Sequence, residues 1–121
     1  MPALDPSTLD LLPHHRAQLL DLLRTHTPDA QVWAYGSRVT GQAHEGSDLD
    51  LVLRNPHDLM QDVAGWRSLQ EALQASRLPM LVEVYQWSRL PEAFHANIEA
   101  GYVVVWDGIQ RQDVVSPLRR L

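Results

Sequence analysis

The chain has 121 residues, of which 45% are hydrophobic, and 15 Asp and Glu against 10 Lys and Arg give a formal net charge of −5. This length and composition predict a single globular domain with an ordinary core, and the acidic balance with scattered basic residues argues against direct binding of nucleic acid. Cysteine is absent and no apolar run is long enough to cross a bilayer, so we exclude disulfides and thiolate sites and expect a cytoplasmic protein that does not bind a membrane.

The first long element predicted along the chain is a helix over residues 14–26, because leucines recur there at helical spacing. Pro28 and Asp29 end it, and Asp5-Pro6-Ser7 can start a shorter helix upstream. His14 and His15 stand side by side at the helix start. Neighbouring side chains on a helix diverge by about 100°, so we assign this pair no metal-binding role.

Two short apolar runs, over residues 32–35 and 48–53, predict buried strands. Gly36 and Ser37 open the polar segment between them, which is short enough for one or two helical turns and is closed by Gly41. A glycine-serine pair entering a helix is typical of a phosphate-binding turn, since it offers free backbone N–H groups, a hydroxyl and the positive end of the helix dipole. Gly36 also lets the backbone approach a phosphate without a Cβ in the way.

The second of these runs contains Asp48 and Asp50. Residues two apart on a strand point to the same face, so the two carboxylates should project together. Their repulsion makes burial costly unless a hard cation such as Mg²⁺ binds them, with substrate phosphates completing its coordination. A phosphate-binding turn facing a carboxylate pair predicts metal-assisted nucleotidyl transfer.

The next two elements predicted are a helix over residues 59–76, with Asp58 as its N-cap, and a strand over residues 80–87. The strand places Glu83 among apolar neighbours. A carboxylate in such a position is rarely buried without a partner, so Glu83 is a candidate site residue.

The last predicted elements are a helix over residues 91–100, with Ser88 as its N-cap, and a strand over residues 102–106. Residues 109–121 are either a frayed tail or a partner-docking segment. The whole pattern predicts an α/β (α+β) fold. We expect one domain over residues 1–121, with a core at about 31–107 and a small mixed sheet of about four strands with helices packed on it.

The order of strand, Gly-Ser, ten intervening residues and Asp-Leu-Asp-Leu resembles the signature of the polymerase-β-like nucleotidyltransferase superfamily, an apolar residue followed by Gly-Gly or Gly-Ser and then Asp-x-Asp or Asp-x-Glu on a strand. Within it, YGSRVTGQAHEGSDLDLVL is most similar to the minimal nucleotidyltransferases, or MNT-domain proteins, which are antitoxins partnered with HEPN-domain toxins. The resemblance implies the minimal nucleotidyltransferase fold.

The resemblance also implies roles for single residues. Gly36 and Ser37 would hold the phosphates of a nucleoside triphosphate. Arg38 would pair with a phosphate oxygen, or else be an ordinary surface arginine. Three acids would be both catalytic residues and Mg²⁺ ligands, with the last of them also drawing the proton from the attacking hydroxyl: Asp48, Asp50 and Glu83.

Two departures from the family pattern stand out. Val39-Thr40 replaces an Ala-Arg pair that is common in minimal nucleotidyltransferases, and Glu83 stands where aspartate is usual. The first removes a basic group near the phosphates. The second lengthens the third acid by one methylene, in a kind of site that tolerates errors of only about half an ångström.

The implied activity is Mg²⁺-dependent transfer of AMP from ATP to a hydroxyl, with a tyrosine of a cognate HEPN ribonuclease toxin as the expected acceptor in a hetero-oligomer. Two alternatives remain open at this point. One is a non-catalytic antitoxin that neutralises the toxin by binding alone. The other is a nucleotidyltransferase acting on a small molecule such as an antibiotic, which we expect to need a further acceptor-binding domain.

Overall fold

A four-stranded mixed sheet forms the centre of the computed structural model, which describes residues 3–44 and 46–108. Its strands follow the spatial order β3-β2-β1-β4. Their bounds are Gln31–Tyr35 for β1, Leu49–Arg54 for β2, Val82–Gln86 for β3 and Val103–Asp107 for β4. β1 runs antiparallel to β2 and β4, whereas β2 and β3 are parallel. The α+β fold with a small mixed sheet, predicted from the sequence, is confirmed.

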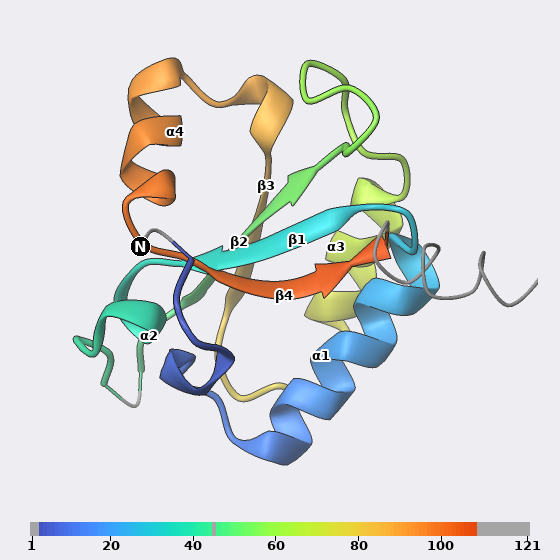
Figure 1. The fold of residues 1–121 in the computed structure, drawn as a ribbon. Coiled ribbons are helices and arrows are strands. Elements are labelled where there is room, and N and C mark those ends of the chain that lie inside the picture. Colours follow the sequence, from blue (N-terminus) through green and yellow to red (C-terminus); the bar gives the residue numbers. More distant parts are fainter. Residues whose placement is uncertain (1–2, 45, 109–121) are drawn as a thin grey trace, which may run out of the picture.

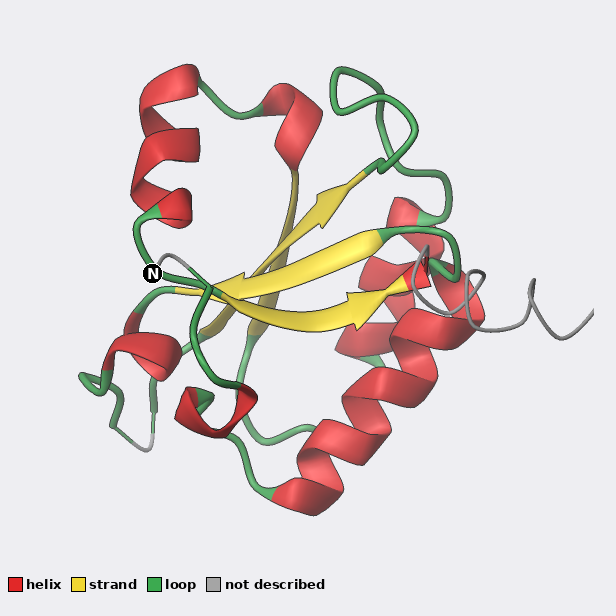
Figure 2. Cartoon of the chain, in the orientation of Figure 1, coloured by secondary structure: helices red, strands yellow, loops and turns green. Residues whose placement is uncertain are grey.

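Two helices, α1 (Pro13–His26) and α3 (Trp66–Gln74), pack on one face of this sheet (Figure 1). The short helix α4 (Glu92–Glu99) and the 3-10 turn η2 (Trp87–Arg89) lie on the other face (Figure 2). A second 3-10 turn, η1 (Pro6–Thr8), and the single-turn helix α2 (Ser37–Thr40) sit at one end of the sheet. The two faces are therefore covered unequally, with the longer helices on one side only.

Alternate side chains of β2 project to opposite faces of the sheet. Leu49, Leu51 and Leu53 are almost fully buried in the main core, beneath α1 and α3. Asp50 and Arg54 alternate with them and so project to the opposite face, the side of α4. Apolar burial stabilises the sheet on both faces, because the side of α4 holds a second, smaller buried cluster of Trp33, Val52, Trp87 and Ile98. Asp50 and Arg54 lie on this second face, next to that cluster.

The helix predicted over residues 59–76 is wrong in its first half, since α3 begins only at Trp66. Residue 65 is a glycine with φ +90°, and a Cβ there would meet the backbone oxygen of His26 at 2.0 Å. A chain forced into this conformation cannot continue a helix through residue 65. Asp58 does not cap a helix either: its Oδ1 accepts a hydrogen bond from the Met60 N–H within a turn.

The structure also corrects the role that the sequence predicts for Ser88, because this residue does not cap the following helix. It belongs to η2, and its hydroxyl donates to Asp62, whose carboxylate also accepts a forked contact from Arg89. α4 itself starts one residue after Pro91, without a side-chain cap. The Ser88 hydroxyl therefore anchors the loop before α3, which the local sequence did not reveal.

Residues 109–121, predicted to be a tail or a docking segment, lie outside the described residues. None of the helices within the described ranges has the length and apolar character needed to cross a membrane.

Candidate active site

The chain leaves β1 through Gly36, which has φ +85° and ψ −157°. Residues other than glycine rarely adopt this backbone conformation. The space is restricted as well, because a Cβ built on Gly36 would stand 2.7 Å from Oδ2 of Asp50. The Asp50 carboxylate thus lies directly against the backbone of the glycine-serine turn, as the two motifs of the sequence require if they share a site.

Strand pairing extends this contact into a row of polar groups across the sheet. Asp50 is opposite Tyr35 on β1 and opposite Glu83 on β3. Paired residues project to the same face, so all three side chains point toward the side of α4. Asp48 lies one residue before β2 and is exposed at the end of this row. The structure therefore brings the three predicted acids to one region of one face.

The acids repel one another in a partly desolvated place. Burial raises the pKa of Asp50 above its ordinary value, and the charges of Glu83 and then Asp48 raise it further. The pKa of Tyr35 is raised in the same way, first by burial and then by the charge of Asp50. Such crowding of negative charge is destabilising in the free protein and is relieved when a cation binds.

Glu83 has a neighbour that the sequence reasoning missed. The hydroxyl of Tyr85 donates to Oε2 of Glu83 at 2.6 Å. This hydrogen bond, with smaller effects of burial and of the nearby carboxylates, raises the pKa of Tyr85 to about 12. The signal was available in the sequence, since Tyr85 follows Glu83 by two positions on a strand and must share its face.

The donor set fits a hard divalent cation, because carboxylate oxygens are the ligands that Mg²⁺ prefers and their mutual repulsion favours its binding. Asp48 and Asp50 are the residues that would hold it. Among the described residues, however, no three Asp, Glu, His or Cys side chains converge closely enough to form a ready metal site. Glu83 is turned toward Tyr85 instead, so its place among the metal ligands stays a prediction.

Arg38 is not a surface arginine. It is buried, and its guanidinium donates to the backbone oxygens of Ser47 at 3.0 Å and Asp10 at 2.8 Å. Arg38 thus ties the residues just before Asp48 to the N-terminal segment. This placement supports a positioning role for Arg38, and its contact with a phosphate stays a prediction. The other predicted phosphate ligand, Ser37, is the first residue of α2 and is only partly buried.

A cavity of about 380 Å³ adjoins Gly36 on the side of α4. Tyr35 and Phe94 contribute aromatic rings to its wall and meet edge to face, with centroids 6.5 Å apart. Phe94 is 42% exposed, so part of its ring is open to the cavity. The cavity therefore offers an aromatic surface next to the turn proposed to bind phosphate.

Fold and site together define a nucleotidyltransferase. A model of the family described as "Nucleotidyltransferase domain" matches residues 16–103, so the chain belongs to this family, and the resemblance drawn from its sequence is confirmed. It is 37% identical over 97 residues, 80% of this chain and 83% of the relative, to a Haemophilus influenzae (strain ATCC 51907 / DSM 11121 / KW20 / Rd) protein named "Probable protein adenylyltransferase MntA".

A solved structure described as "Crystal structure of the toxin-antitoxin with AMP-PNP" shares the fold, with a TM-score of 0.61 over 87% of this chain and 90% of the other. The two sequences are 16% identical, so this likeness concerns the fold alone. The roles of individual residues stay predictions.

Proposed function

We propose that this nucleotidyltransferase transfers AMP from ATP to a tyrosine hydroxyl of a cognate HEPN-domain ribonuclease toxin, and that it acts in this way as the antitoxin of a cytoplasmic toxin-antitoxin pair. The observation that carries the proposal is the contact between the two motifs. Asp50 Oδ2 lies so close to Gly36 that a Cβ would be 2.7 Å away, which supports one site shared by this carboxylate and the turn proposed to bind phosphate.

Each residue has a defined part in this reaction. Backbone N–H groups of Gly36 and Ser37, with the Ser37 hydroxyl, bind and orient the triphosphate. Asp48 and Asp50 would hold Mg²⁺, which when bound would supply positive charge that stabilises the transferring phosphoryl group. Glu83, opposite Asp50 in the sheet, accepts the proton of the attacking hydroxyl. The hydroxyl oxygen then bonds to the α-phosphorus and pyrophosphate leaves.

The aromatic cavity beside Gly36 supports a place for the adenine base. A base stacked on Phe94 would leave its phosphates within reach of Gly36, which lines the same cavity. The open face of the row formed by Tyr35, Asp50 and Glu83 then remains for the acceptor. Because Glu83 lies on β3, at the edge of the sheet, the acceptor hydroxyl can approach from the partner protein without crossing the core.

A protein acceptor is supported by the relative at 37% identity, whose name is that of a protein adenylyltransferase. The proposal that this protein acceptor is a toxin is supported by the solved structure with the same fold, which is that of a toxin-antitoxin with AMP-PNP. An adenylate on the toxin would add negative charge and bulk where an RNA phosphate must bind, and so disfavour RNA by repulsion and blockage.

The test is intact-mass measurement of the proposed HEPN-domain toxin, co-expressed with the wild type, with Asp48→Asn or with Asp50→Asn. We expect adenylate on the toxin with the wild type alone, because each variant removes one of the two carboxylates that hold the metal. An unmodified toxin in all three, with growth rescued by all three, would instead indicate an antitoxin that neutralises by binding alone.

A further inference from the structure

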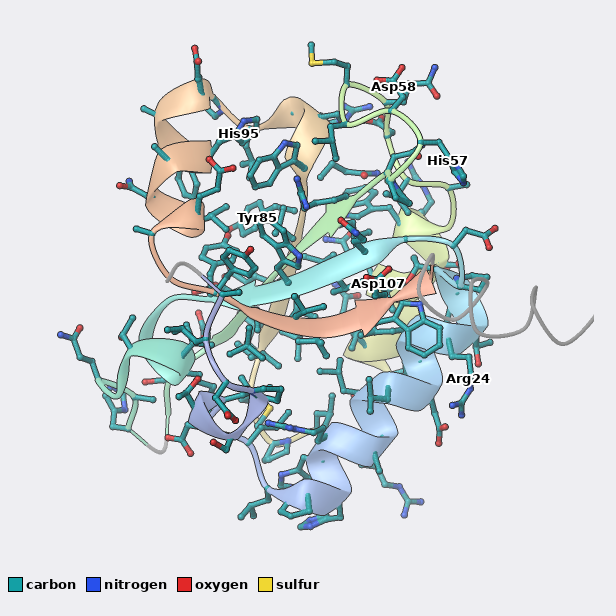
Figure 3. The ribbon with its side chains drawn as sticks, viewed as in Figure 1. Arg24, His57, Asp58, Tyr85, His95 and Asp107 are labelled. Atoms are coloured by element: carbon teal, nitrogen blue, oxygen red, sulfur yellow. The ribbon has the colours of Figure 1, made fainter. Side chains whose placement is uncertain are left out.

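One exposed tyrosine of this chain has its hydroxyl next to Glu83, the residue proposed to accept the proton of the acceptor hydroxyl. Tyr85 is 38% exposed, and its hydroxyl donates to Oε2 of Glu83 at 2.6 Å. Glu83 in turn is paired with Asp50 on β2, so the phenol oxygen lies at the acidic end of the site. Figure 3 shows Tyr85 on the side of the sheet that faces α4. Asp50 and Glu83 project to this side as well, because they are paired across the sheet.

The other two tyrosines of the sequence do not share these properties. Tyr102 is partly buried and stacked on Trp33, with ring centroids 3.7 Å apart. Tyr35 is half-buried beside Asp50, with its ring against Phe94. Only Tyr85 combines an exposed ring with a hydroxyl held by the carboxylate that would act as the base.

We propose that Tyr85 is itself an adenylate acceptor, so that the chain modifies its own active-site tyrosine. The inference rests on the proposed function, because it uses the same nucleotide and the same three acids. The Tyr85 oxygen bonds to the α-phosphorus of ATP, the bond from that phosphorus to the bridging oxygen breaks, pyrophosphate leaves, and the phenol proton passes to Glu83. ATP is the only co-reactant, so atoms and charge balance.

Self-modification also has a consequence for the transfer to a partner. An adenylate on Tyr85 places a phosphodiester charge beside Glu83 and fills the space through which another hydroxyl would reach it. The modified chain is therefore a slower enzyme toward any other acceptor. In the unmodified chain, Tyr85 and the partner's hydroxyl compete for Glu83.

The experiment incubates the purified full chain with MgCl₂ and ATP labelled at the α-phosphate, followed by intact-mass measurement and peptide mapping. We expect the wild type to gain one adenylate on the peptide that contains Tyr85. Tyr85→Phe should lose at least about tenfold of the label, as expected when the reacting oxygen is removed. Tyr102→Phe is the matched control, since it removes a phenol outside the site, and it should keep the label.

The rate of labelling tests whether the step takes place within one molecule. A first-order rate that does not change when the protein is diluted tenfold is expected, and a rate that falls in proportion would overturn the intramolecular step. Label on any residue other than Tyr85, or full label on Tyr85→Phe, would also overturn the inference.

An unlabelled wild type overturns the inference whatever the partner does. The partner protein, added to the same reaction, then decides the proposed function separately. An adenylated partner leaves the proposed function standing without Tyr85 as an acceptor, and an unmodified partner counts against both.

Discussion

Replacing Gly36 with alanine is the sharpest test of the site, because one methyl group affects both the glycine-serine turn and the Asp50 carboxylate. The residue has φ +85° and ψ −157°, a conformation that costs a residue with a Cβ about 1–3 kcal/mol. At about 4 °C per kcal/mol for a domain of this size, a loss near 2 kcal/mol lowers Tm by about 8 °C. The new Cβ would also stand 2.7 Å from Asp50 Oδ2, so that carboxylate must move.

The displacement of Asp50 sets the expected loss of activity. Restoring an ordinary contact of 3.4 Å requires a shift of about 0.7 Å, which exceeds the displacement of about half an ångström that a productive site tolerates. We expect nucleotidyl transfer to fall by about tenfold or more, since a misplacement of about 1 Å can cost a factor of a hundred. The assay is adenylate transfer at saturating ATP and Mg²⁺, with thermal unfolding measured on the same samples.

Gly41 provides a matched control at the other end of α2. It too has positive φ, +80°, but a Cβ there would meet nothing within 4 Å. Gly41→Ala should therefore cost about 1 kcal/mol of stability from backbone strain while transfer stays within twofold of the wild type. Equal loss of transfer in both variants would show that general destabilisation, and not the contact with Asp50, reduces activity.

A double-mutant cycle isolates the contact itself. In an Asp50→Ala background the clash is gone, and Gly36→Ala should cost only its backbone strain. The cycle compares free energies of unfolding, and we expect a coupling of about 1 kcal/mol between the two positions, within the range found for residues in contact. A coupling of zero would refute the geometry from which the site was inferred.

Three further predictions concern the neighbours of this contact. Arg38→Ala should lower stability by about 3 kcal/mol in denaturant unfolding, since it removes two charged hydrogen bonds to backbone oxygens, whereas exposed Arg24→Ala should change it by no more than about 0.5 kcal/mol. Because the pKa of Asp50 is raised, its charge destabilises the fold above that pKa and not below its ordinary value of 3.8. Asp50→Asn should therefore raise Tm at pH 7, and this gain in Tm should shrink toward pH 4. A gain that stays constant with pH would contradict the raised pKa. Phe94→Ala should weaken ATP binding about tenfold in calorimetric titration by removing a stacking surface, with Met60→Ala, 83% exposed and outside that cavity, as the control that keeps its affinity.

The sequence determined the features that depend on neighbouring positions along the chain. Alternation along residues 48–53 places the leucines on one face of β2 and Asp50 on the other, and the glycine at position 36 marks the turn that only a residue without a Cβ can make. Both are local rules, and together with the spacing of the two motifs they were enough to predict the fold class and the family.

Only the tertiary structure decided how distant segments meet. The parallel pairing of β3 with β2 sets Glu83 opposite Asp50 across 33 positions of sequence, and a shift of one residue would have turned Glu83 to the core face. The buried Arg38 side chain donates to the carbonyls of Ser47, nine positions later, and of Asp10, 28 positions earlier, and no local pattern encodes this pair of contacts. The first turns of the helix predicted over residues 59–76 do not form, because Gly65 approaches the backbone of His26 closely. Packing between elements here outweighs helical periodicity within one segment.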